Sequence, residues 1–259
     1  MESEQRRPLV TLDGEDLGHG RDRQGRPAHL VLPGLSLTLH EGERVALLGQ
    51  SGAGKSTLLG ALRARLGRGA AWCPQHHGLV PQLAVYHNVY MGRLPERSAL
   101  ANLWNLVRPL ARPWQEVVEL CELVGLAGLA RRPVGQLSGG QRQRVAIARA
   151  FYQGREVFLG DEPVASVDPH QALRLLALID SRHITQVVAL HQRELALSHF
   201  DRVWGLRDGR LVIDAPADEL TLADLDSLYP DATDDPSSVE EAAPAPPDPE
   251  ALPCARGRP

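Results

Sequence analysis

The stretch Gly49-Gln50-Ser51-Gly52-Ala53-Gly54-Lys55-Ser56 decides the fold of this chain. It matches the phosphate-loop pattern G-x-x-x-x-G-K-[S/T] at every position. The apolar run 45–48 precedes it, and a segment with leucines at helical spacing follows it, so the strand–loop–helix context of the pattern is present. Backbone N–H groups in such a loop surround phosphate oxygens, and the following helix directs the positive end of its dipole at them. The stretch therefore predicts an α/β fold with a nucleotide-phosphate site.

Two side chains of this loop carry the expected chemistry. We expect the ammonium of Lys55 to reach the β- and γ-phosphates and the hydroxyl of Ser56 to hold Mg²⁺. The ATP contacts predicted in this part of the chain are Gly49, Gln50, Ser51, Gly52, Ala53, Gly54, Lys55, Ser56 and Thr57.

Composition restricts the class of protein. The chain has 259 residues, 43% of them hydrophobic, which is enough for a large domain with a sizeable core. A net charge of −4 and an aromatic content of 4% disfavour nucleic acid as a partner. The polar N-terminus lacks the apolar core of a signal peptide, and no apolar run is long enough to span a membrane, so we expect a cytoplasmic protein.

Hydrophobic patterning predicts how the chain is divided. Apolar or alternating runs predict strands at 9–17, 35–39, 45–48, 70–73, 157–159, 187–190, 203–206 and 210–213, the last two joined by a hairpin at Asp208-Gly209. Helices are expected at 85–91, 98–110, 114–124, 139–152 and 171–180. We therefore expect an α/β ATP-binding core over 1–78 and 133–228 and a helical subdomain over 79–132. The proline-rich, acidic tail over 229–259 is predicted to be disordered.

Two further motifs lie in the second half of the chain. Ser138 in Leu137-Ser138-Gly139-Gly140-Gln141 occupies the position of a helix N-cap, and the glycines allow close approach of a phosphate. Alone, this motif is most often a capped helix. The acidic pair Asp161 and Glu162 follows the buried run 157–160, where phosphate-loop enzymes place Mg²⁺ and the attacking water.

Together these motifs resemble the ATP-binding subunits of ABC transporters, over about residues 9–228. The resemblance implies a P-loop NTPase core of the ABC ATPase type, with a mixed β-sheet flanked by helices, a helical subdomain insert and an antiparallel β-subdomain. It also implies that two subunits pair head to tail, so that each ATP lies between the phosphate loop of one and the signature motif of the other. The residues expected to act in trans are Ser138, Gly139, Gly140, Gln141 and Asp168.

The same resemblance assigns the remaining site residues. It implies that Asp161 positions Mg²⁺ together with Ser56 and Gln75, and that Gln75 also senses the membrane partner. Glu162 corresponds to the catalytic base and His191 to the switch histidine that contacts the γ-phosphate. The catalytic residues expected are thus Glu162, His191 and Lys55, and the cofactors are ATP and Mg²⁺.

Three segments are similar to phosphonate-importer ATPases in particular. They are 75–81 with 88–94, 161–169, and 190–192 with 202–210. The adjacent His76 and His77 could suggest a metal site, but neighbouring residues of an extended chain point to opposite faces, which favours a loop role. In this family the ATP-binding subunit does not contact the transported solute, so this similarity indicates the substrate only through relatedness to other importers.

Two features depart from the family pattern. Lys55 and Gln75 are about half as far apart as usual, which predicts a reduced antiparallel β-subdomain. Between Leu9 and Leu35 there is no Phe, Tyr or Trp to stack on adenine, and His19 is the nearest candidate. Because base stacking contributes roughly 1–3 kcal/mol, we expect weaker ATP affinity or looser base choice without loss of chemistry.

Several functions compete at this point. The first is the ATPase of an importer for phosphonate or a related organophosphorus anion, peripheral to the cytoplasmic face of the inner membrane. Its partners would be a second ATP-binding subunit, giving a homodimer, with membrane permease subunits and an extracytoplasmic binding protein. The alternatives are an importer ATPase for another small solute, a soluble ABC ATPase accessory to a phosphonate-degrading complex, and a scaffold without turnover, which the intact catalytic residues disfavour. An apolar surface for a permease helix is expected from Leu79, Val80, Pro81, Leu83, Val85 and Tyr86.

Overall fold

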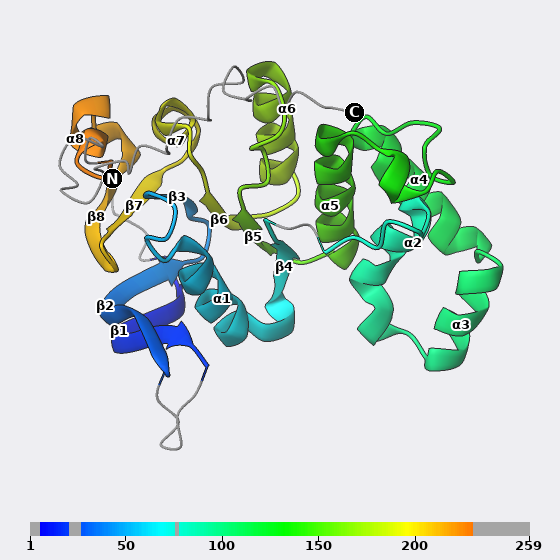
Figure 1. Cartoon of the computed structure of the whole chain (residues 1–259), viewed down its shortest axis with the longest axis horizontal. Helices are drawn as coiled ribbons and strands as arrows, with labels where there is room; N and C mark the ends of the chain where they lie inside the picture. Colours follow the sequence, from blue (N-terminus) through cyan, green and yellow to red (C-terminus); the bar gives the residue numbers. More distant parts are fainter. Residues whose placement is uncertain (1–5, 21–26, 76–77, 230–259) are drawn as a thin grey trace, which may run out of the picture. The chain divides into compact units, whose positions relative to one another are not determined.

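The computed structural model describes residues 6–20, 27–75 and 78–229 (Figure 1). A six-stranded sheet runs through this part of the chain in the order β4-β5-β6-β3-β7-β8. Its strands are β3 (Arg44–Leu48), β4 (Ala70–Cys73), β5 (Val157–Asp161), β6 (Thr185–Ala189), β7 (Arg202–Arg207) and β8 (Arg210–Pro216). The β7–β8 pair is antiparallel and all other pairs are parallel, so the sheet is mixed, as the sequence predicts.

Helices follow most strands of this sheet. They are α1 (Lys55–Leu66), α2 (Val85–Tyr90), α3 (Ala99–Val107), α4 (Ala111–Leu123), α5 (Gly139–Gln153), α6 (Pro169–Asp180), α7 (Arg193–His199) and α8 (Leu222–Asp226). Short 3₁₀ turns are η1 (Gly67–Gly69), η2 (Met91–Glu96), η3 (Val134–Gln136) and η4 (Ala217–Glu219). Within the described ranges no helix combines the length and the apolar character needed to cross a bilayer.

The inner strands are covered on both faces. Every residue of β5 and β6 is buried, as expected of parallel strands with helices on either side. Because side chains alternate along a strand, Ala46 and Phe158 pack into one cluster with α5 and α6, whereas Val45 and Leu159 pack into another with α1. Figure 1 shows α5 and α6 on one side of β5 and β6, and α1 on the other.

Strand register brings the candidate site residues to one edge of the sheet. Leu47 of β3 lies opposite Ala189 of β6, and Asp161 of β5 lies opposite the same Ala189. The carboxyl ends of these parallel strands therefore meet, and the segments that leave them are neighbours. The phosphate loop leaves β3, Glu162 follows β5, and His191 follows β6.

A separate antiparallel pair, β1 (Pro8–His19) and β2 (His29–His40), extends further than the sequence predicts. The strand expected at 35–39 begins at His29, because Pro33-Gly34 does not end it. The ladder passes this point through shifts of register, with Glu15 opposite Leu35 and Leu17 opposite Leu32. A pattern that indicates a turn therefore sits inside a bulged strand.

Between β4 and α5 the described residues form helices joined by turns and irregular segments, with one isolated β-bridge between Ala84 and Pro133. The helix boundaries differ slightly from those expected. α3 ends at Val107 rather than residue 110, and α4 begins at Ala111, so Pro113 lies in its first turn. The hairpin between β7 and β8 is confirmed, with positive φ at both Asp208 and Gly209. The tail 230–259 and the pair His76 and His77 fall outside the described residues.

Candidate active site

Glycine is required at two positions of the phosphate loop. Gly49 has φ 146°, and a Cβ there would lie 2.4 Å from the carbonyl oxygen of Leu206. Gly54 has φ 104°, and a Cβ there would lie 2.8 Å from Leu32 Cδ2. At these two positions the loop passes against β7 and β2 with no space for a side chain, and it leads directly into α1, whose N-terminus has no side-chain cap.

Lys55 is the first residue of α1, and its ammonium is folded into the loop. Nζ donates to the carbonyl oxygens of Gly49 at 2.6 Å and Gln50 at 3.1 Å. Burial lowers the pKa of Lys55, and the carboxylates of Glu162 and Asp161 oppose this shift. The loop lysine and both strand-end acids therefore act on one another electrostatically.

A cavity of about 330 Å³ gathers residues from five places in the sequence. Its walls are Ser51, Gly52, Gly54, Lys55, Ser56 and Thr57 of the loop and helix start, together with His19, Val31, Gln75 and Glu162. His19 reaches this cavity from the end of β1, and its Nε2 lies 3.2 Å from Thr57 Oγ1. The imidazole of His19 is therefore the candidate in this cavity for the side chain that, by the resemblance, would stack on adenine.

Glu162 is the centre of the polar contacts in this cavity. Its backbone has φ 55°, a conformation that costs a non-glycine residue energy and is concentrated at functional sites. Its Oε1 lies 2.6 Å from His191 Nε2, and its Oε2 accepts from Gln75 Nε2 at 3.2 Å. With 12% of its side chain exposed, the carboxylate is sheltered but still open to the cavity.

Oxygen ligands suited to Mg²⁺ lie at or near the cavity at the phosphate loop. Ser56 and Gln75 line the cavity, and Asp161 is buried at the end of β5. A hydroxyl, an amide and a carboxylate form the hard oxygen set that Mg²⁺ prefers, and this cation usually keeps several waters besides. The residues present therefore fit the cation. No cluster of three or more His, Cys, Asp or Glu side chains suited to a metal occurs in the described ranges.

The signature segment lies apart from this cavity. Ser138 caps α5 through a capping box, in which its Oγ accepts from Gln141 N at 3.2 Å and Gln141 Oε1 accepts from Ser138 N at 2.9 Å. Asp168 caps α6 through a single hydrogen bond, its Oδ1 accepting from Gln171 N at 3.0 Å. None of residues 138–141, nor Asp168, lines the cavity at the phosphate loop.

Comparison with known proteins places this geometry in a family. Residues 32–165 match the ABC transporter family. The chain belongs to this family. It is 40% identical, over 85% of its length and 89% of the relative's, to the phosphonates import ATP-binding protein PhnC of Pseudomonas putida. It is also 40% identical to the protein of that name in Anaeromyxobacter dehalogenans. That alignment covers 86% of this chain but only 48% of the longer relative.

Two further comparisons extend the result. The phosphite import ATP-binding protein PxtA of Stutzerimonas stutzeri is 41% identical over 75% of this chain and 79% of its own length. The solved dimeric structure of a bacterial ABC transporter cassette superposes with a TM-score of 0.66 at 23% identity, covering 80% of this chain and 98% of that one. The fold of this chain is thus that of an ABC ATPase, and the protein is an ATPase of the ABC type.

Sequence reasoning missed one residue of this ABC ATPase, Gln143. Its side chain is 1% exposed, and it donates from Nε2 to the carbonyl oxygen of Glu162 at 2.7 Å while Oε1 accepts from Ser166 N at 2.9 Å. It therefore connects α5 to the segment that carries both Glu162 and Asp168. The available signal was its spacing, because Gln143 shares a helix face with the buried Ile147 and Ala150.

The apolar surface expected for a permease helix is partly wrong. Val85 and Tyr86 are fully buried in the core that joins α2 to α5, so neither can contact a partner. The isolated apolar run 79–86 does not reveal this burial, because a short apolar segment can belong to a core or to a surface. Leu79 and Leu83 remain partly exposed, and Val80 and Pro81 are exposed.

Proposed function

We propose that this ABC ATPase drives import of a phosphonate or a related organophosphorus anion. The observation that supports the chemistry is the contact of Glu162 with both His191 and Gln75 at the mouth of the phosphate loop. The support for the substrate class is the 40% identity to a phosphonate import ATP-binding protein over most of both chains, and the similar likeness to a phosphite import protein. Both solutes are small phosphorus oxyanions.

Glu162 has the surroundings of a general base. It would take a proton from the water that attacks the γ-phosphate, while ADP leaves with the β-phosphate oxygen. His191 would hold the carboxylate in line with the reacting water. Lys55 and the backbone N–H groups of residues 49–56 would balance the charge that develops on the phosphoryl oxygens.

Magnesium would be held by Ser56, Gln75 and Asp161. When bound, it would neutralise charge on the β- and γ-phosphates. The residues of this chain would position the nucleotide and the attacking water within a sheltered cavity.

The active unit is proposed to be a homodimer. Because Ser138, Gly139, Gly140, Gln141 and Asp168 lie apart from the cavity of their own chain, they are available to close the cavity of a second copy. The capping box uses the N–H groups of Ser138 and Gln141 and does not involve those of Gly139 and Gly140, which would be free to bind a γ-phosphate presented by that copy. Hydrolysis would then require closure of the dimer, and this motion would be transmitted to the permease.

The assembly would place the subunit at the cytoplasmic face of the membrane. The proposed partners are permease subunits and an extracytoplasmic binding protein. Among the described residues, Leu79, Val80, Pro81 and Leu83 are exposed or partly exposed beside the helical segment and would contact the permease.

Reconstitution with the permease tests the proposal. The ATPase is assembled in proteoliposomes with a candidate permease and binding protein, and turnover is measured with methylphosphonate, phosphite or an unrelated amino acid. We expect stimulation by one of the two phosphorus oxyanions and none in the Glu162→Gln assembly. Stimulation by the amino acid alone would refute the substrate class, and a complex with soluble phosphonate-degrading enzymes in place of a permease would refute the transport role.

A further inference from the structure

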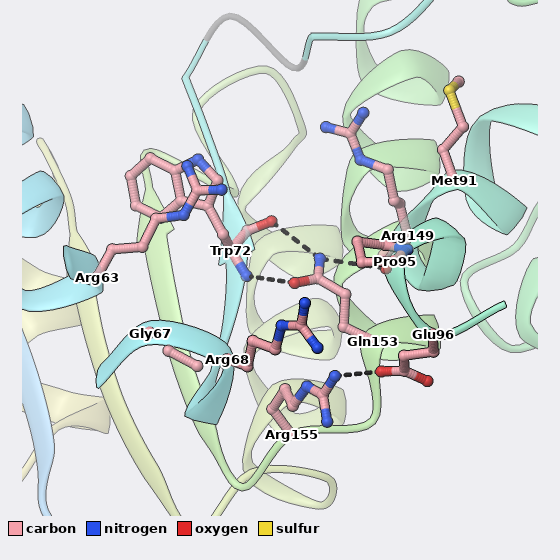
Figure 2. A pocket seen from close by; sticks show the side chains of 12 residues that line it. Arg63, Gly67, Arg68, Trp72, Met91, Pro95, Glu96, Arg149, Gln153 and Arg155 are labelled. Carbon is pink, nitrogen blue, oxygen red and sulfur yellow. Dashed lines mark hydrogen bonds and ion pairs between the residues drawn. The ribbon is translucent and has the colours of Figure 1, made fainter. Parts of the chain in front are cut away.

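A second cavity, of about 380 Å³, lies where α1 ends and β4 begins (Figure 2). Only the three residues of η1 join α1 to β4, and the opposite wall is formed by η2 and α5. Its charged lining consists of one carboxylate, Glu96, and four arginines, Arg63, Arg68, Arg149 and Arg155. The cavity shares none of its lining residues with the cavity at the phosphate loop.

The one carboxylate that lines this arginine cavity is already paired. Glu96 forms an ion pair with Arg155 and also lies 3.8 Å from Arg93, so its charge is already used. Within the part of the chain that the structure describes, neither Arg63 nor Arg68 forms an ion pair. Such a concentration of guanidinium groups is unusual on a chain whose net charge is −4, and an anion would relieve the repulsion within it.

The walls of the arginine cavity are held in place. The guanidinium carbon of Arg63 lies 5.3 Å from the ring centroid of Trp72. The amide of Gln153 accepts from the backbone N–H of Trp72 at 3.1 Å and donates to its carbonyl oxygen at 3.3 Å. In Figure 2 these bonds hold Gln153 against β4, and the side chains of Arg68 and Arg155 lie below it in the cavity, where Arg155 is paired with Glu96.

We propose that the arginine cavity binds a phosphate-type oxyanion, held between the guanidinium groups of Arg68 and Arg155 with Arg63 at its rim. A planar guanidinium presents paired N–H donors that match the oxygens of a tetrahedral oxyanion. The size of the cavity suits a small anion with its waters, at the low end of the range for ligand pockets. The chemistry is common to inorganic phosphate and to a phosphonate, so either could be the source.

The arginine cavity also adjoins the loop of Gln75. Arg149 lines the cavity, and its Nη1 donates to the carbonyl oxygen of Gly78 at 2.9 Å, just after Gln75 in the chain. Arg149 therefore links one wall of the arginine cavity to the segment that follows Gln75. The inference does not depend on the transport role.

Direct binding tests the inference. The full chain is saturated with Mg²⁺ and a non-hydrolysable ATP analogue, so that the phosphate loop is occupied, and radiolabelled orthophosphate is added in equilibrium dialysis. We expect about one phosphate bound per chain. The Arg63→Gln, Arg68→Gln double variant should weaken binding at least about tenfold, since each charge-assisted contact contributes more than 1 kcal/mol.

Arg174→Gln is the matched control, because Arg174 is exposed on α6, away from the arginine cavity. It should bind phosphate as the wild type does, and thermal melting checks that both variants are folded. Competition identifies the source: displacement at a lower concentration of methylphosphonate than of unlabelled orthophosphate indicates the transported class, and the reverse indicates free phosphate. Equal binding by the wild type and the double variant would overturn the inference. A second result would also overturn the inference: the wild type binds no oxyanion, and the double variant no longer co-purifies with the permease. The arginines would then contact an acidic partner.

Discussion

Nε2 of His191 lies 2.6 Å from Oε1 of Glu162, although the two residues follow different strands. The second carboxylate oxygen of Glu162 is held by Gln75 at 3.2 Å. Gln75 follows β4, Glu162 follows β5 and His191 follows β6, so the ends of three strands bring these side chains together at one carboxylate. A group held from both sides in this way is placed to accept a proton in a defined direction.

Replacing this carboxylate by an amide should separate binding from hydrolysis. Glu162→Gln retains the size of the side chain but cannot act as a base, so ATP should still bind and kcat should fall by about 10²–10⁴. Steady-state phosphate release and nucleotide binding, measured on the same preparation, check this. Turnover at the wild-type rate would show that another group takes the proton.

Gln143 is predicted to position Glu162 without touching nucleotide. Gln143→Ala removes both of its hydrogen bonds, so kcat should decrease while the Kd for ATP stays nearly unchanged, and the free energy of unfolding should fall by about 1–3 kcal/mol. Gln115→Ala, an exposed glutamine on α4, is the control and should change neither quantity. Gln143→Glu still accepts from Ser166 N but cannot donate to the carbonyl oxygen of Glu162, so its kcat should fall as far as that of Gln143→Leu. Wild-type kcat in Gln143→Glu would argue against a positioning role. A pure stability effect would leave kcat unchanged below the melting transition.

His19 is predicted to set the affinity for the base. An imidazole is a smaller stacking surface than a phenol, so His19→Tyr should tighten ATP binding by about tenfold and His19→Ala should weaken it, with kcat nearly unchanged in both. Fluorescent-nucleotide titration measures the effect. His29→Ala is the control, because His29 pairs with His19 in the sheet but does not line the cavity. Micromolar affinity with a preference of the wild type for ATP over GTP would contradict the expectation of weak base recognition.

Most strands of the sheet and the position of the phosphate loop could be predicted because they depend on local patterns. Apolar runs mark buried parallel strands, and the loop motif requires the strand before it and the helix after it. The contact between Glu162 and His191 could be anticipated only through the resemblance, because strand register joins positions that are distant in sequence. The strand expected at 35–39 was too short because a bulged ladder carries it back through Pro33-Gly34 to His29.

Side-chain burial explains the remaining failures. Val85 and Tyr86 look like surface residues in a short apolar run, but α5 covers them. Gln143 looks like a solvated helix residue, yet both ends of its amide are used inside the protein. Contacts between separate elements determine which of these side chains are buried, and a short window of sequence does not contain those contacts.

His183 predicts how stability depends on pH. Its side chain is 4% exposed, its ring lies 5.1 Å from that of Phe158, and its Nδ1 lies 2.7 Å from the carbonyl oxygen of Arg155. Burial lowers the pKa of His183 to about 4, and the nearby charge of Arg182 acts in the same direction. In the unfolded chain the pKa is about 6.5, so between these values the unfolded state binds more protons.

Stability should therefore be lost as the pH falls from about 6.5 toward 4, and regained as it rises. This one group should contribute about 2 kcal/mol of the loss between pH 7.5 and pH 5, on the linkage relation for a buried histidine. Urea denaturation at the two pH values measures it. In His183→Gln, which cannot titrate, the loss should be smaller by that amount, whereas the exposed His170→Gln should lose as much as the wild type. If His183→Gln and the wild type lost the same stability, the ring would have to become charged inside the protein at little cost, and its burial between Phe151 and Phe158 would not control its protonation.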